Sequence, residues 1–208
     1  MKVSRLCVLL SAGATLLALT GCKKAEVAGN EQSTAAVENN EASAAPSGAA
    51  SNDPVASAES AAPAAITHAA SVVAIDANGA MKSLRKGSNG WTCMPDAPTT
   101  PGPDPMCFDA NAGKWVDAWV HHRPPPADTV GLMYMLEGGT DASNTDPYAT
   151  QPTPDNDWVK TGPHIMVVGS RQILAGHPAG GTPDTSVPYV MWAGTPYAHL
   201  MVPVGSQH

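Results

Sequence analysis

The fold is decided by two segments of matching pattern, Pro163-His164-Ile165-Met166-Val167-Val168 and Ala198-His199-Leu200-Met201-Val202-Pro203. Successive side chains of a β-strand point to opposite faces, so each segment predicts a strand with one aliphatic face and one face that carries His and Met. Imidazole and thioether are donors that suit Cu(I), so copper is the metal that this second face favours. The candidate metal ligands are the four residues of that face: His164, Met166, His199 and Met201.

A third strand is predicted from Thr129 to Leu136, because β-branched, aliphatic and aromatic residues alternate there. Its alternation places Met133, Met135 and Glu137 on one face, where the two thioethers could add to a copper site. Glu137 is either a ligand or acid on that face or a solvated charge before the Gly138-Gly139 turn. A plainer alternative is that the methionines fill the core and each histidine is an ordinary buried or surface side chain.

The remaining pattern predicts a small α+β domain. A hairpin with a turn at Asn78-Gly79 and a last hairpin near the C-terminus are expected, and a short helix should begin at Asp109 or Asn111 and end before Pro124. The expected strands are 71–76, 81–85, 129–136, 164–168, 187–193 and 197–204. The prediction is a mainly antiparallel sheet of five or six strands with one short helix, which could curl into a small barrel.

Aromatic residues supply a second kind of candidate site. Trp115, Ala118, Trp119 and His122 share one face of the expected helix, which is either its docking surface or a platform for a sugar or aromatic ligand. The candidate pocket residues for a small ligand are Glu137, Trp192 and Tyr197. A hydrolase is a further alternative with His199 as base, although the sequence has none of the usual nucleophile motifs in a suitable context.

The N-terminus has the pattern of an export signal. Lys2 and Arg5 precede an apolar run from Leu6 to Leu19, which is too short for a spanning helix. The run closes with Leu19-Thr20-Gly21-Cys22, which resembles the lipobox of bacterial lipoproteins. The resemblance implies removal of residues 1–21, a lipid on Cys22 and, since Lys23 follows, an outer-membrane anchor with the domain facing the periplasm or the cell surface. The alternative is an ordinary secretory signal that ends in cysteine.

The next stretch, residues 22–65, is rich in Ala, Ser and Glu and has almost no large apolar side chain, so it is expected to be a disordered tether. A single globular domain is then expected over residues 66–208. The net charge of −7 provides no basic surface for a polyanion, which argues against nucleic-acid binding.

Two cysteines remain after the signal and the lipidated residue are set aside, Cys93 and Cys107. An exported protein lies in an oxidising compartment, so this pair is expected to form a disulfide. A metal–thiolate site is the alternative, but it lacks a second close Cys or His pair.

Three motifs of the domain resemble those of an uncharacterised family of exported bacterial proteins: Gly90-Trp91-Thr92-Cys93-Met94-Pro95, Asp104-Pro105-Met106-Cys107 and 192–201. The resemblance implies export and brings no activity with it. The sequence therefore predicts an envelope-anchored lipoprotein that binds a small ligand or an envelope protein, or has a structural role. Periplasmic copper binding and hydrolysis are the alternatives.

Overall fold

The structure is a computed structural model that describes residues 52–76, 81–98, 100, 102–139 and 142–205. The expected signal, the lipidation site at Cys22 and the turn at Asn78-Gly79 lie outside the described residues. The chain divides into two units, Met1–Ala42 and Ser43–His208, and the fold below is that of the second.

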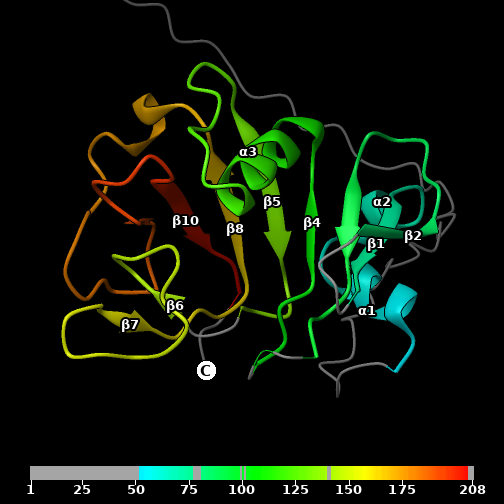
Figure 1. The fold of residues 1–208 in the computed structure, drawn as a ribbon, viewed down its shortest axis with the longest axis horizontal. Helices are drawn as coiled ribbons and strands as arrows, with labels where there is room; N and C mark the ends of the chain where they lie inside the picture. The colour runs from blue at the N-terminus through cyan, green and yellow to red at the C-terminus, as the bar shows by residue number, and fades with distance from the viewer. Residues whose placement is uncertain (1–51, 77–80, 99, 101, 140–141, 206–208) are drawn as a thin grey trace, which may run out of the picture. The chain divides into compact units, whose positions relative to one another are not determined.

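An eight-stranded sheet runs through the second unit in the order β2-β1-β3-β4-β5-β8-β10-β9 (Figure 1). Its strands are β1 (Ser71–Ile75), β2 (Met81–Arg85), β3 (Thr92–Met94), β4 (Met106–Phe108), β5 (Gly131–Met135), β8 (His164–Val168), β9 (Tyr189–Met191) and β10 (His199–Pro203). All neighbours are antiparallel except β1 and β3, which are parallel. Two short strands, β6 (Ala142–Ser143) and β7 (Trp158–Val159), form a separate pair.

The α+β class is confirmed, but the expected count of five or six strands is wrong. The sheet is mixed, and it does not close into a barrel because β2 and β9 occupy its two ends. The additional strands β3 and β4 have three residues each, which is too short for the period-two pattern to be read from the sequence.

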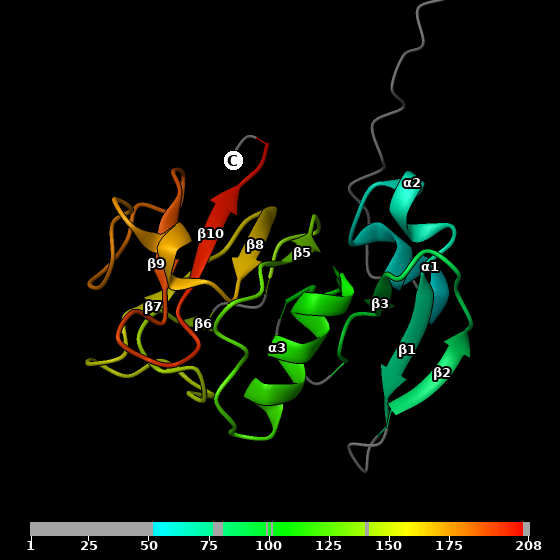
Figure 2. The same cartoon turned by 90° about the horizontal axis from the view of Figure 1, so that it is seen from above.

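Helix α3 (Ala110–Val120) is the helix expected from the sequence. Asp109 caps it, because its side chain accepts hydrogen bonds from the backbone N–H groups of Asn111 and Ala112. The helix lies alongside β5 (Figure 2), and its buried residues Ala112, Trp115 and Ala118 form the docking face. His122, which the helical spacing also placed on that face, lies past the end of the helix at a positive φ of 52° and stacks on Tyr148.

Helix α1 (Pro54–Ser60) lies within the region predicted as tether, and α2 (Ala64–Thr67) crosses its predicted end at residue 65. Ala58 and Ala61 of this segment are fully buried in a cluster with the disulfide, so the expected domain boundary at residue 66 is wrong for residues 52–65. Alanine favours helix and loses no side-chain rotamer freedom on burial, so an alanine-rich segment can pack without large apolar residues.

The Cys93–Cys107 disulfide is present, with an S–S distance of 2.03 Å. The two residues lie directly opposite each other on β3 and β4, and both are fully buried. The bridge therefore joins the parallel part of the sheet, around β1 and β3, to the antiparallel part that begins at β4.

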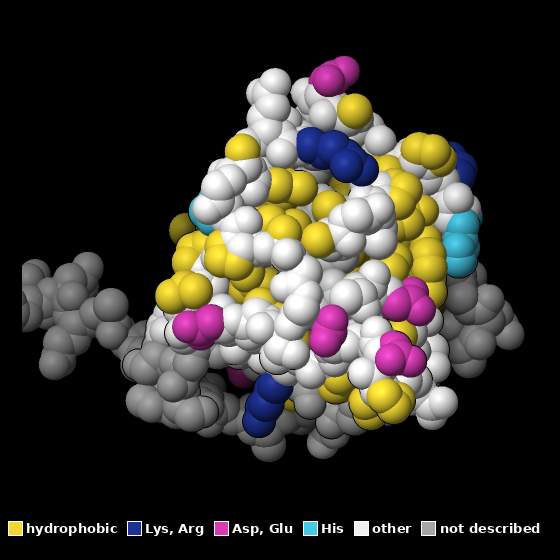
Figure 3. Space-filling model, turned by 90° about the vertical axis from the view of Figure 1, so that its left-hand side faces the viewer, with side chains coloured by type: hydrophobic (Ala, Val, Ile, Leu, Met, Phe, Trp, Pro, Cys, Tyr) yellow, Lys and Arg dark blue, Asp and Glu magenta, His cyan; other side chains and the backbone are white. Residues whose placement is uncertain are grey.

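Surface features add two observations. No helix within the described ranges is long and apolar enough to cross a bilayer. Figure 3 shows the side of the molecule on which β6, β7 and their neighbouring loops lie in Figure 1. Hydrophobic side chains gather over the centre of this face, among a few scattered charged side chains.

Candidate functional site

The two His-x-Met strands are neighbours in the sheet. β8 and β10 are antiparallel, with Met166 opposite Met201. β5 lies on the other side of β8, with Met133 opposite Met166 and Met135 opposite His164. Because residues paired across strands share a face, the structure brings the four candidate metal ligands and both β5 methionines onto one face of the sheet.

A cavity of about 150 Å³ lies against this face. Its walls hold six methionines, two histidines and three tryptophans: Met106, Met133, Met135, Met166, Met191, Met201, His164, His199, Trp115, Trp119 and Trp192. The opposite wall comes from α3, which supplies Trp115 and Trp119. The sheet thus contributes the sulfur and imidazole donors, and the helix contributes aromatic rings.

His199 is the most deeply buried donor, with 1% of its surface exposed. Its Nδ1 lies 3.0 Å from the carbonyl oxygen of Tyr197. A carbonyl can only accept, so this Nδ1 carries the proton and Nε2 keeps its lone pair. That Nε2 is buried and has no hydrogen-bond partner among the described residues.

His164 has the same arrangement. Its Nδ1 lies 2.7 Å from the carbonyl oxygen of Gly162, again two residues earlier in the chain, so Nε2 is again the unprotonated nitrogen. The ring is 4% exposed. In metal sites a ligating histidine almost always donates its other ring N–H to a carbonyl or carboxylate, and both histidines already meet that condition.

Burial lowers the pKa of both histidines. Desolvation is the main cause for His164. It also lowers the pKa of His199 to about 4, where the hydrogen bond to Tyr197 opposes the shift and a smaller electrostatic effect of His164 adds to it. Both rings are therefore neutral at pH 7 and available as nitrogen donors.

The aromatic wall is closely packed around His199. The rings of Trp115 and Trp192 are parallel within 5° at a centroid distance of 6.0 Å, and both contact His199 edge-on, at 5.4 and 4.9 Å. Such packing keeps water away from the imidazole, so any ligand that reaches Nε2 does so in a largely dry environment.

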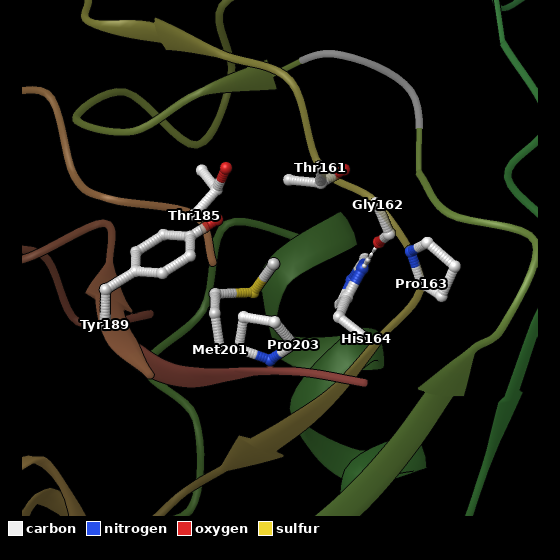
Figure 4. A pocket seen from close by; sticks show the side chains of 8 residues that line it. All are labelled: Thr161, Gly162, Pro163, His164, Thr185, Tyr189, Met201 and Pro203. Atoms are coloured by element: carbon white, nitrogen blue, oxygen red, sulfur yellow. Dashed lines mark hydrogen bonds between the residues drawn. The ribbon is translucent and has the colours of Figure 1, made fainter. Parts of the chain in front are cut away.

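A second pocket, of about 10 Å³, shares Thr161, His164 and Met201 with the cavity. Figure 4 shows the Met201 side chain between the Tyr189 ring and the His164 ring. The Tyr189 hydroxyl has no hydrogen-bond partner within the part of the chain that the structure describes, and burial raises its pKa to about 12. A pocket of this size is about the smallest that can hold one water molecule.

Of the three residues predicted for a ligand pocket, Trp192 lines the cavity, whereas Glu137 and Tyr197 are not among its lining residues. β5 ends at Met135, so the alternation that placed Glu137 beside the methionines does not continue to it. Tyr197 instead packs edge-on against Trp115 and donates a hydrogen bond to the carbonyl of Arg123.

Sequence reasoning missed Met106 and Met191 as cavity residues. Met191 lies opposite His199 on β9, and its alternation with Tyr189 within an expected strand could have indicated it. Met106 follows Pro105 inside the disulfide loop and gave no periodic signal. Trp115 and Trp119 were recognised as a helix face but not as cavity walls.

A hydrolase with His199 as base would need a nucleophile in the same cavity. The lining residues of the described cavity include one threonine, Thr161, and no serine or cysteine. Within the same described ranges, no three His, Cys, Asp or Glu side chains converge as a metal site. The donors that do converge are the two imidazoles and the thioethers.

No family model, curated protein or solved structure matches this chain. Function is therefore inferred from the chemistry of the cavity.

Proposed function

We propose that this protein binds Cu(I) in the methionine-lined cavity and serves in the handling of monovalent copper. The observation that carries the proposal is the Nε2 atom of His199, whose lone pair is buried and unpartnered among the described residues, in a residue that lines a cavity with six methionines. Leaving such a polar atom unsatisfied costs about 1–3 kcal/mol. A metal ion bound there would remove that cost.

The donor set supports Cu(I) over divalent ions. Neutral thioether and imidazole groups select soft cations, whereas Mg²⁺, Ca²⁺ and Mn²⁺ prefer oxygen donors. A buried +1 charge is also less costly than +2 where few carboxylates compensate it. Asp104 is the one acidic residue that lines the described cavity, and burial raises its pKa above the usual value for an aspartate.

The tryptophans suit the same ion. A cation placed near the face of an indole ring is stabilised by the ring quadrupole, by about 0.5–2 kcal/mol. The stacked Trp115 and Trp192 rings would also shield the ion from water and from oxidants.

Export and anchoring belong to this proposal. The signal-like N-terminus and the lipobox at Cys22 support an outer-membrane lipoprotein, and the buried Cys93–Cys107 disulfide suits an oxidising compartment. Mass spectrometry of the protein from membranes is expected to find an acylated Cys22 at the N-terminus. An intact Met1, or an unmodified Cys22, contradicts the anchor and leaves the metal site unaffected.

A small apolar ligand is the second candidate, because a mostly apolar cavity of this size, with three indoles in its walls, can hold a single aromatic ring. If the protein binds such a molecule and has no affinity for Cu(I), the small ligand is favoured over the metal.

The experiment is an anaerobic titration with Cu(I) in competition with a chromogenic chelator. His199→Asn is the informative variant, because the Asn amide can donate to the Tyr197 carbonyl as Nδ1 does but has no counterpart of Nε2. The exposed His68 provides the control variant His68→Asn. We expect wild type and His68→Asn to remove Cu(I) from the chelator, and His199→Asn to retain less. Equal retention by all three contradicts the proposal.

A further inference from the structure

The Met166–Met201 pair is the centre of a local two-fold arrangement. Met166 lies directly opposite Met201 on antiparallel strands, and each has a histidine two residues earlier in its own strand. Because the strands run in opposite directions, His164 and His199 lie on opposite sides of this pair. The register puts His199 level with Val168, four residues from His164, or about 13 Å along the strands.

The outer strands complete the symmetry. His164 lies opposite Met135 of β5, and His199 lies opposite Met191 of β9. Directly opposed residues in an antiparallel pair have Cβ atoms about 5 Å apart, so each histidine has one thioether beside it and a second two residues along its own strand. Two triads of identical composition result: His164, Met166 and Met135, and His199, Met201 and Met191. All six residues line the same cavity.

The two histidines are also prepared for binding in the same way. Each donates Nδ1–H to the carbonyl of the residue two positions earlier, Gly162 for His164 and Tyr197 for His199. The protonated nitrogen is therefore fixed in both rings, and Nε2 is the donor atom in both.

We propose that the cavity holds two Cu(I) ions, one at each His-Met-Met triad. This inference rests on the proposed function and adds its stoichiometry and ligand sets. One nitrogen and two sulfurs are sufficient donors for three-coordinate Cu(I). A single ion shared by both histidines would need the two Nε2 atoms within about 4 Å of each other, since metal–nitrogen bonds are about 2 Å long. The separation of the two residues along the strands opposes this.

The two sites differ in their surroundings. The His199 ring contacts Trp115 and Trp192. The His164 ring lies beside the smaller pocket with Thr161 (Figure 4). Copper at the His199 triad should therefore quench tryptophan fluorescence more strongly than copper at the His164 triad, which allows the sites to be distinguished.

The test is the number of copper atoms retained per chain after anaerobic loading of the purified protein with Cu(I) and removal of excess ion. We expect two for wild type and for His68→Asn, one for His164→Asn, one for His199→Asn and none for the double variant. The strong fluorescence quench should persist in His164→Asn and disappear in His199→Asn. Far-UV circular dichroism and the Cys93–Cys107 disulfide report whether each variant folds.

If a histidine variant does not fold, Met135→Leu and Met191→Leu replace it, because leucine preserves the apolar volume and removes one sulfur from one triad. Each is expected to weaken one of the two binding events by about tenfold or more. A wild-type stoichiometry of one, abolished by either histidine variant, overturns the two-ion inference and leaves copper binding intact. A wild-type protein that retains no copper overturns both.

Discussion

The indole Nε1 of Trp192 donates a 2.9 Å hydrogen bond to the backbone carbonyl of Ser143, and the Trp192 backbone N–H donates to the carbonyl of Asn144. These contacts connect one wall of the cavity to the β6 segment, 49 residues away in the chain. Trp192 has a positive φ of 54°, so these contacts hold its backbone in a region that non-glycine residues rarely adopt. The loop that contains Ser143 is therefore part of the structure of the site.

Replacing Ser143 tests this connection. The Ser143 hydroxyl donates to the carbonyl of Asn156 and accepts from the backbone N–H groups of Thr145 and Asp146. Ser143→Ala should lower the free energy of unfolding by about 1–3 kcal/mol, because buried polar groups lose their partner. Urea denaturation measures the loss, and a red shift of tryptophan emission should accompany it.

Ser186→Ala is the matched control for Ser143, since the Ser186 hydroxyl is exposed and donates a local hydrogen bond to Asp184. A change of less than about 0.5 kcal/mol is expected there. Equal losses in the two variants would show that the Ser143 loop does not support the site.

Gly131 sets the distance between β5 and α3. A Cβ at this position would lie 2.3 Å from the Ala112 nitrogen and 2.6 Å from its Cα. Both are backbone atoms of the helix, so Gly131→Ala must move α3 away from the sheet. We expect a loss of stability of about 2 kcal/mol or more and weaker Cu(I) binding, because the aromatic wall moves with the helix.

Gly113→Ala, on α3 itself, is the comparison for Gly131. Its added Cβ would lie 3.3 Å from the Phe108 ring, a side chain that can yield. Helix propensity favours alanine over glycine by about 1 kcal/mol, which offsets the tight contact. If thermal denaturation gives Gly131→Ala a melting temperature equal to or above that of Gly113→Ala, the close packing of helix and sheet is contradicted.

Arg85 holds α1 and α2 to the sheet. Its guanidinium donates to the carbonyls of Thr67 and Ala70 and pairs with Glu59. Arg85→Lys keeps the positive charge, but the lysine ammonium lacks the planar set of donors with which the guanidinium makes these three contacts at once. Limited proteolysis should then cut between residues 54 and 70 several times faster than in wild type.

Lys82→Arg, at an exposed position of the same strand, is the control for Arg85 and should leave the cleavage rate unchanged. If Arg85→Lys is cleaved no faster than this control, the guanidinium contacts do not anchor the N-terminal helices.

The stability of the metal-free protein should depend on pH through His199. Its pKa is about 4 in the folded state against an ordinary value of 6.5, so the unfolded chain takes up the proton first as pH falls. Above pH 6.5 the ring is neutral in both the folded and the unfolded state, so protonation of His199 does not reduce the free energy of unfolding. The free energy of unfolding should fall by about 1.4 kcal/mol per pH unit as pH drops from 6.5 towards 4.

His199→Asn isolates this effect, because the other titratable groups that line the cavity, His164 and Asp104, remain in the variant. In the presence of a chelator, wild type should lose more of its free energy of unfolding than His199→Asn does as pH falls through this range. A difference that is constant from pH 7 to pH 4.5 contradicts a depressed pKa for His199.

The sequence by itself determined the local features of this protein. Alternation along single strands placed His beside Met at 164–166 and at 199–201, and the helix over 110–120 followed from its cap and apolar spacing. The Cys93–Cys107 disulfide followed from the number of cysteines that remain once Cys7 and Cys22 are assigned to the expected signal and lipidation site. Each of these depends on residues close together in the chain or on composition, where periodicity and chemistry suffice.

Only the tertiary structure decided how these pieces meet. Strand register is set by loops and by side-chain packing between distant segments, so the opposition of Met166 to Met201, and of His199 to Met191, could not be read from the chain. The same holds for α1, whose small alanines pack only because the disulfide cluster provides a surface for them. The cavity exists because α3 covers the methionine face, and that contact joins residues that no local pattern connects.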